Sequence, residues 1–147
     1  MRIAIGSDHA GYDQKMRLGA CLAEQGHEVQ DFGTFNAEQS VDYPDFAVDV
    51  GRAVASGSAR FGLLVCGTGI GMSITANKVA GVRAANVTTP QFARLAREHN
   101  DANVLTLSAR FVPVEENERI LEAFLGTEFG GERHEKRIAK IHAAEQG

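Results

Sequence analysis

The sequence is short of the features that mark cross-linked or membrane-bound proteins. It contains only two cysteines, Cys21 and Cys66, and they do not form a CxxC pair. A disulfide framework or a cysteine-rich zinc site is therefore not expected, and a reducing compartment fits better. No apolar run approaches the roughly 18 residues that a spanning helix needs, and no signal-like segment follows Met1. We expect a cytoplasmic protein that does not act at a membrane.

Positive charge is also scarce. Fifteen basic residues stand against 19 acidic ones, for a formal net charge of −4. This balance disfavours a nucleic-acid binder, although a local basic cluster could still hold a small anion. Apolar residues make up 44% and charged residues 23%, which is ordinary globular usage and excludes disordered and fibrous classes. A chain of 147 residues predicts one domain with a substantial core.

Short apolar runs alternate with longer amphipathic segments along the chain. Five runs of strand length alternate with five helical segments, so the pattern predicts an α/β fold: a Rossmann-like three-layer α/β/α sandwich with a five-stranded parallel sheet. A charged, helix-forming C-terminal tail follows Gly131 and has no obvious place in the sandwich. The predicted strands are 3–5, 29–32, 62–66, 82–87 and 104–107, and the predicted helices are 12–25, 44–56, 71–79, 90–98 and 114–125.

The first strand ends in a carboxylate and an imidazole. Asp8 and His9 lie within the segment Gly6–Gly11, at the edge of a parallel sheet where ligands bind. The segment lacks the G-x-G-x-x-G pattern of dinucleotide-binding turns. Two interpretations stay open: Asp8 and His9 belong to a site, or Asp8 is a helix N-cap and His9 a surface residue.

The third strand ends in the glycine-rich segment Cys66-Gly67-Thr68-Gly69-Ile70-Gly71. Its glycines allow a close backbone approach to a ligand, and its N–H groups would open a helix, which predicts an anion cradle or oxyanion hole. Cys66 at the rim would be a usable base or nucleophile as the thiolate; the alternative is a small buried side chain. Met72 stands where a dinucleotide motif needs its third glycine, and the Walker pattern is absent.

Other candidate residues lie farther along the chain. His99 and Asn100 end a predicted helix, Arg110 follows the fifth strand, and Arg133 and Arg137 lie one helical turn apart in the tail. Neither arginine has a carboxylate three or four residues away, and two such arginines suit a phosphate, although a charge run is usually only a solvated face. The five histidines show neither HxxxH nor HExxH spacing, so no metal site is expected.

Taken in order, these motifs resemble those of type B ribose-5-phosphate isomerases over nearly the whole chain. The wider family also holds allose-6-phosphate and galactose-6-phosphate isomerases. The resemblance implies a cofactor-free aldose–ketose isomerase that works as a homodimer, or a dimer of dimers, with sites at the subunit interface. The motifs are Gly6–Gly11, Asp42-Tyr43-Pro44, Cys66–Gly71, Ala76-Asn77-Lys78, His99–Asn103 and Arg133-His134 with Arg137.

The resemblance also implies roles for single residues. Cys66 would be the base that moves a proton between the two carbons of an enediolate; some family members use a glutamate at the position that is Met72 here. Glu132 departs from the family's usual Gly-Gly-Arg-His pattern, and two interpretations stay open: it weakens the neighbouring arginine's contact, or it simply points to solvent. The remaining implied roles are enediolate binding by Thr68 and the N–H groups of Gly67, Gly69, Ile70 and Gly71, ring opening by His99 with Asp8, hydroxyl binding by Asn100, and phosphate binding by His9, Arg110, Arg133 and Arg137.

Three functions are weighed on this basis. Isomerisation of ribose 5-phosphate is favoured over allose 6-phosphate, although one extra hydroxymethylene group is hard for a pocket to reject. A non-catalytic sugar-phosphate-binding module would not need Cys66, Thr68 and His99. Thiol redox catalysis lacks a resolving cysteine. Because so small a domain has little surface to enclose a sugar phosphate, we expect the tail, residues 131–147, to pack on a partner subunit and complete its site.

Overall fold

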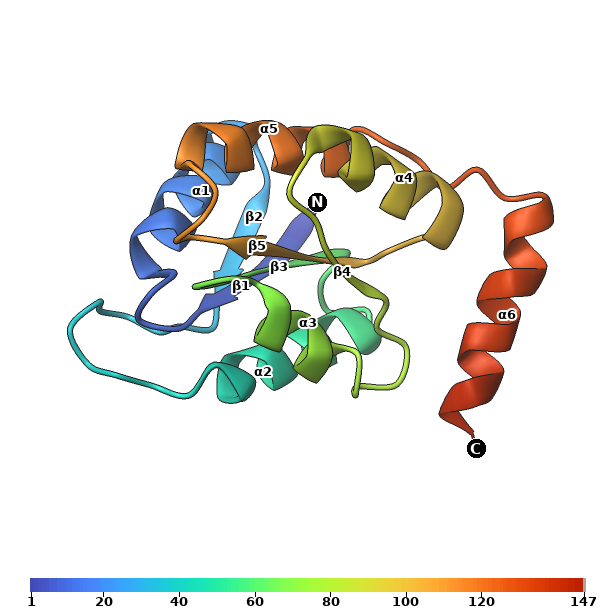
Figure 1. The fold of residues 1–147 in the computed structure, drawn as a ribbon, viewed down its shortest axis with the longest axis horizontal. Coiled ribbons are helices and arrows are strands. Elements are labelled where there is room, and N and C mark those ends of the chain that lie inside the picture. Colours follow the sequence, from blue (N-terminus) through green and yellow to red (C-terminus); the bar gives the residue numbers. More distant parts are fainter. Residues whose placement is uncertain (147) are drawn as a thin grey trace.

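The computed structural model describes residues 1–146, which form a parallel sheet between two layers of helices (Figure 1). The strand order is β2-β1-β3-β5-β4, and every neighbouring pair is parallel. This arrangement confirms the predicted sandwich. The strands are β1 Arg2–Ser7, β2 Glu28–Asp31, β3 Phe61–Cys66, β4 Ala84–Asn86 and β5 Val104–Ser108, and the helices are α1 Tyr12–Glu24, α2 Tyr43–Ala55, α3 Ile70–Ala76, α4 Pro90–Asn100, α5 Val114–Leu125 and α6 Arg133–Glu145.

The central strand β3 has all six residues buried, because helices cover both faces of the sheet. Alternate side chains enter two separate cores, as the two-residue period of a strand requires. Leu63 packs in the core under α1, α4 and α5, whereas Leu64 packs in the core over α2 and α3. The two helical layers lie above and below the sheet in Figure 1.

The edge strand β4 is shorter than predicted, and so is α3. Asn77 ends α3, and its side chain pairs with the backbone of Ala84: the Asn77 amide donates to the Ala84 carbonyl at 3.0 Å and accepts the Ala84 N–H at 2.8 Å. The Arg83 N–H donates to the Asn103 side chain at 2.8 Å instead of to a strand. Side chains thus satisfy backbone groups that a longer strand would have paired.

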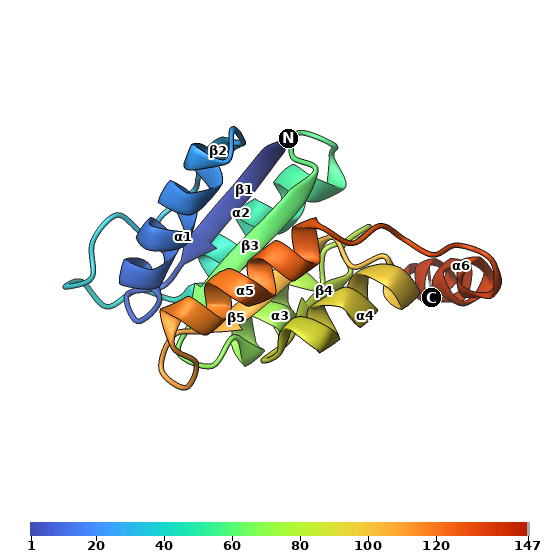
Figure 2. The same ribbon diagram turned by 90° about the horizontal axis from the view of Figure 1, so that it is seen from above.

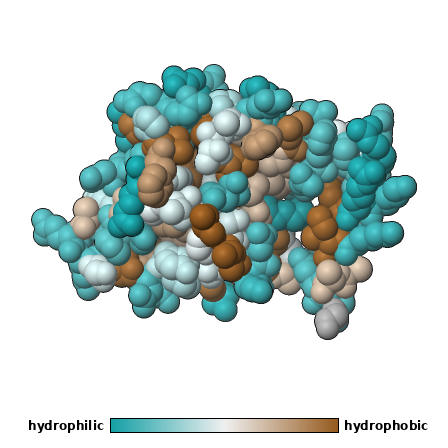
Figure 3. All heavy atoms as spheres, viewed as in Figure 1, coloured by the Kyte–Doolittle hydropathy of each residue, from teal (hydrophilic) through white to brown (hydrophobic). Residues whose placement is uncertain are grey.

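The predicted tail is a helix, α6, that lies outside the sandwich (Figures 1 and 2). It runs beside the end of α4, and the Gly130 N–H donates to the Glu98 carbonyl at 2.9 Å where the connection passes α4. Figure 3 shows a hollow with apolar side chains between α6 and the body. A separate apolar area lies over α3, where Ile70 and Ile74 are more than half exposed. Within residues 1–146, no helix has the length and apolarity to cross a bilayer.

Candidate active site

The carboxyl ends of β1, β3 and β5 are neighbours in the sheet, so the residues that follow them converge. The Asp8 N–H donates to the Val65 carbonyl at 3.3 Å, and the Arg110 N–H donates to the Gly67 carbonyl at 3.0 Å. The structure thereby brings together one set of the predicted site residues. We call this set the loop half-site; its members are Asp8, His9, the segment Cys66–Gly71 and Arg110.

The glycine loop folds back over the thiol that precedes it. The Gly69 N–H donates to Cys66 Sγ at 3.2 Å, and the thiol is buried with 5% of the residue exposed. The Cys66 sulfur is thus an acceptor of a backbone N–H at the mouth of the loop. Gly69 reaches this position with φ of +82°, a left-handed conformation that favours glycine. The Ile70 N–H donates to Thr68 Oγ1 at 3.1 Å, which leaves the hydroxyl hydrogen available to a ligand.

Two side chains pack closely on glycines of the loop. A Cβ on Gly67 would lie 3.1 Å from Arg110 Nη1, and a Cβ on Gly71 would overlap the ring of Tyr43. The Arg110 guanidinium therefore lies across the loop. Tyr43 is a site candidate that had no role in our sequence interpretation, although the Asp42-Tyr43-Pro44 motif pointed to its neighbourhood.

Asp8 and His9 are both held by backbone groups. Asp8 is buried, and its Oδ1 accepts the Gly11 N–H at 3.0 Å; Gly11, not Asp8, is the N-cap residue of α1. Nδ1 of His9 accepts the Val41 N–H at 3.2 Å. An acceptor Nδ1 has no hydrogen, so the imidazole is neutral with its hydrogen on Nε2. His9 can thus donate one directed hydrogen bond to a substrate.

A buried lysine, which we did not single out in the sequence, holds the start of the connection between β2 and α2, the segment that includes Val41. Lys15 Nζ donates to the two carboxylate oxygens of Asp31 at 2.7 and 2.9 Å and to the Thr34 carbonyl at 2.6 Å. Two further hydrogen bonds of 2.8 Å pair this segment with the end of β1: the Ser7 N–H donates to the Gly33 carbonyl, and the Thr34 N–H donates to the Ser7 carbonyl. The sequence held one signal that Lys15 is buried: it lies three residues before Leu18, on the same face of α1.

The other predicted residues lie at the opposite edge of the sheet. Helix α4 starts beside the carboxyl edge and runs back for 11 residues, about 15 Å, so its end lies at the amino edge. Figure 2 shows this end beside α6. The ring of His99 stacks on that of His134, with centroids 4.5 Å apart. We call this second set the helix half-site; its members are His99, Asn100, Arg133 and Arg137.

The two tail arginines are exposed, and within residues 1–146 neither has a hydrogen-bond or ion-pair partner. Glu132 is exposed as well, with φ of +53° at the start of α6. The structure therefore does not bring His99 and Asp8 together within one chain, nor Arg133 and Arg110. Within one chain the predicted site residues form two separate groups, at opposite ends of the sheet.

The remaining candidates lie outside both half-sites. Met72 is fully buried in the core that α3 shares with α2, and its thioether cannot act as a base. Cys21 is half-buried beside α5, and burial, followed by the charge of Glu118, raises the pKa of its thiol. Over residues 1–146, no three histidine, cysteine, aspartate or glutamate side chains converge in a way that could hold a metal ion.

Comparison with known proteins gives one consistent result. The model of the Ribose/Galactose Isomerase family matches residues 3–141. Ribose-5-phosphate isomerase B of Escherichia coli is 46% identical over 145 residues, which span 99% of this chain and 97% of that protein. The structure of Clostridium thermocellum ribose-5-phosphate isomerase B superposes with a TM-score of 0.97 at 49% identity, covering 99% of this chain and 98% of the other.

A second solved structure carries a ligand. Ribose-5-phosphate isomerase B of Mycoplasma genitalium, solved with bound ribulose 5-phosphate, superposes with a TM-score of 0.95 at 44% identity. The match covers 99% of this chain and 96% of that one.

Proposed function

The chain belongs to the ribose/galactose isomerase family, and from that premise we propose that it interconverts ribose 5-phosphate and ribulose 5-phosphate without a cofactor, in the cytoplasm. The observation that carries this proposal is the Gly69 N–H donating to Cys66 Sγ at 3.2 Å. It joins a proton-accepting sulfur to a loop of N–H donors. Proton abstraction beside a carbonyl needs both groups within reach of the same substrate carbons.

Ring opening comes first, because ribose 5-phosphate is mostly a closed furanose. The carboxylate of Asp8, buried at the loop half-site, and the imidazole of His99 move one proton from the anomeric hydroxyl and one to the ring oxygen. The ring C–O bond breaks, and an open-chain aldehyde remains. Asn100, next to His99 at the end of α4, holds the sugar hydroxyls.

Isomerisation then moves one proton between adjacent carbons. The Cys66 thiolate takes the proton from C2, and the electron pair forms the C1–C2 double bond as negative charge develops on O1. The Gly69 and Ile70 N–H groups already donate to Cys66 Sγ and Thr68 Oγ1, so the other N–H groups of Gly67–Gly71 and the free hydroxyl hydrogen of Thr68 stabilise that oxygen; loss of one such donor costs about 2.7–4 kcal/mol of transition-state stabilisation. The thiol returns the proton to C1, the hydroxyl hydrogen moves from O2 to O1, and ribulose 5-phosphate leaves.

A second copy of the chain completes the site in this proposal. The loop half-site of one copy meets the helix half-site of the other, so that His9 and Arg110 share the phosphate with Arg133 and Arg137. Two features support this pairing. Ile70 and Ile74 on α3 beside the loop are exposed apolar side chains.

The second feature is a cleft of about 640 Å³ between α6 and the body, lined by Asn100 of the helix half-site and by apolar side chains that include Val82 and Ile141. An exposed apolar patch and an apolar cleft on one chain suit a two-fold interface, in which each surface is used twice. A dimer of dimers would repeat the same pairing, and in either assembly the tail lies against the neighbour whose site it completes.

The test follows the hydrogen at C2. The protein is incubated with ribose 5-phosphate in deuterated water, and both ribulose 5-phosphate and deuterium at the carbon beside the carbonyl are measured. We expect product and label from the wild type and neither from Cys66→Ala, with Cys21→Ala as the matched cysteine control. If the wild type shows neither product nor exchange, the isomerase proposal is refuted and a non-catalytic sugar-phosphate-binding module becomes the better interpretation. If allose 6-phosphate is turned over faster in a parallel assay, the hexose phosphate replaces ribose 5-phosphate as the proposed substrate.

A further inference from the structure

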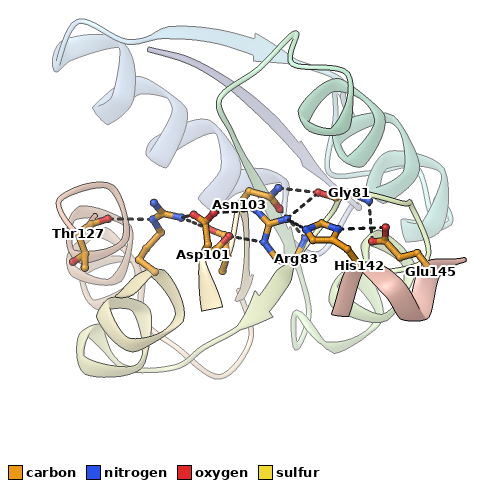
Figure 4. A network of polar contacts seen from close by, with 9 residues as sticks. Gly81, Arg83, Asp101, Asn103, Thr127, His142 and Glu145 are labelled. Atoms are coloured by element: carbon orange, nitrogen blue, oxygen red, sulfur yellow. Dashed lines mark hydrogen bonds and ion pairs between the residues drawn. The ribbon is translucent and has the colours of Figure 1, made fainter. Parts of the chain in front are cut away.

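Two side chains near the end of α6 contact the segment that leads into β4 (Figure 4). His142 Nε2 lies 3.1 Å from Arg83 Nη1. Glu145 Oε1 accepts the Gly81 N–H at 2.9 Å, and Glu145 Oε2 lies 3.4 Å from His142 Nδ1. We call Arg83, His142, Glu145 and the Gly81 N–H the α6 clasp.

The donors and acceptors of the clasp are matched. A guanidinium can only donate, so His142 Nε2 is the acceptor and the ring hydrogen is on Nδ1, directed at Glu145. The hydrogen bond from the Gly81 N–H outweighs burial and, with the contact from His142, holds the pKa of Glu145 below its usual range, so the carboxylate is ionised. His142 therefore joins a cation to an anion through its two ring nitrogens.

The clasp is anchored on a rigid part of the body. Arg83 Nε donates to the Asp101 carbonyl at 2.8 Å, and the Asp101 carboxylate accepts from Arg83 at 3.4 Å and from the buried Arg97 at 2.9 Å. Asn103 donates to the Gly81 carbonyl at 3.0 Å. These bonds tie the clasp to the turn that follows α4, directly after His99 and Asn100.

Helix α6 has few other supports, since it lies outside the sandwich (Figure 1). His134 and Ile138 are its only residues that are buried, and both lie in its first half, where Arg133 and Arg137 also lie. A helix held only there would pivot about that contact. The clasp adds a second attachment eight residues beyond His134, about 12 Å along the axis, and two attachments set the direction of the helix.

We propose that His142 is a positioning residue for phosphate binding: by connecting Arg83 to Glu145 it fixes α6, and hence the placement of the Arg133 and Arg137 guanidinium groups. The inference rests on the proposed function, because that function assigns these arginines to the phosphate. His142 touches no substrate in this scheme. Its contribution is to geometry, and a small misplacement of binding groups is costly in affinity.

The test compares three variants for binding and for turnover. His142→Ala removes the connection, whereas His142→Gln restores an acceptor for Arg83 and a donor for Glu145. Lys140→Ala is the matched control on an exposed part of the same helix. The measurements are kcat and KM for ribose 5-phosphate, the Kd of inorganic phosphate by calorimetry, hydrogen exchange of α6, and oligomeric state.

We expect His142→Ala to raise KM and the phosphate Kd together, roughly tenfold, with little change in kcat, as for a lost ground-state binding contribution. Exchange in α6 should become faster, His142→Gln should return most of the affinity, and Lys140→Ala should match the wild type. Should His142→Ala fail to fold, Glu145→Gln is tested in its place. The glutamine keeps an acceptor for the Gly81 N–H but presents an amide N–H, not a carboxylate oxygen, to His142.

Three results would overturn the positioning role: unchanged KM and phosphate Kd in the clasp variants, a fall in kcat alone, or dissociation into monomers as the sole cause of weaker binding. The phosphate measurement needs no turnover. A wild type that binds phosphate but does not isomerise therefore refutes the proposed function and leaves the clasp to be judged on phosphate affinity.

Discussion

The imidazole of His134 stacks on that of His99 with ring centroids 4.5 Å apart and planes 17° from parallel. The contact joins the first turn of α6 to the last turn of α4. Burial lowers the pKa of His134, and the charges of His99, Arg133 and Arg137 lower it further. A proton on His134 would thus be placed among cations in a partly dehydrated position, so the folded protein favours the neutral ring.

This pKa shift predicts an acid-dependent loss of stability. A histidine with a lowered pKa in the folded state binds protons more readily in the unfolded chain. Its stabilising contribution is complete above the ordinary value of 6.5 and is lost as the pH falls through the folded-state pKa. We expect the free energy of unfolding, measured by urea denaturation, to decline below pH 6.5 in the wild type. His134→Phe, which keeps the stack without the titration, should decline less; an equal decline in His134→Phe and in the control His27→Gln would refute the assignment.

Separation of the two half-sites predicts complementation between inactive chains. Cys66→Ala removes the thiol of the loop half-site, and His99→Ala removes the imidazole of the helix half-site. In a mixed dimer one site combines both defects and the other has neither, so equal mixing should restore up to about a quarter of wild-type activity. The measurement is isomerase activity after the two variants are unfolded and refolded together. Activity that stays at the level of the separate variants would mean that each chain uses only its own residues.

The glycine loop allows a matched pair of substitutions. Gly69 and Gly57 have φ of +82° and +81°, so alanine costs each about 1–2 kcal/mol of backbone strain. A Cβ on Gly57 meets nothing within 4 Å, whereas one on Gly69 would lie 3.0 Å from the Leu107 carbonyl oxygen and overlap Asn86. We expect Gly57→Ala to lose stability only. Gly69→Ala should lose more stability and roughly a hundredfold in kcat/KM, because the loop donors move; similar kinetics in both variants would exclude a role for loop placement.

The buried Lys15 predicts a large stability effect with a specific contrast. Lys15 is fully buried and paired with Asp31, while Arg17, on the same helix, is half exposed and pairs with Glu118 at 2.7 Å. Lys15→Met should cost about 3 kcal/mol of unfolding free energy, since it strips a buried pair of one member. Arg17→Met should cost less than about 1 kcal/mol, as for surface ion pairs. Equal losses in thermal or urea unfolding would contradict this account.

Local pattern was sufficient for most of the fold. The alternation of apolar runs and helical segments predicted five parallel strands, because burial on both faces demands apolar residues at every position of a strand such as β3. The helix predicted over 90–98 does start at Pro90, where the Thr89 hydroxyl accepts the Phe92 N–H at 3.2 Å. The glycines that follow Cys66 predicted a loop of N–H donors with the cysteine at its rim, and the Gly69 N–H does donate to Cys66 Sγ.

The order of elements also separates two groups of the predicted site residues. A helix that leaves the carboxyl edge must return to the amino edge, so His99 and Asn100, at the end of α4, had to lie away from Cys66 in the same chain. The order of elements was enough to separate the half-sites. It was not enough to show which surfaces lie beside each of them.

The sequence by itself determined the class of fold, the glycine loop with its cysteine, and the arginines of the tail, because each depends on residues within one or two turns of each other. Only the tertiary structure decided that Tyr43 lies on Gly71, that Lys15 is buried against Thr34, and that Arg83 meets His142 across 59 residues. The physical reason is that residue type and periodicity specify which face of an element is buried. They do not specify which distant polar group that face will meet; packing of the whole chain settles that choice.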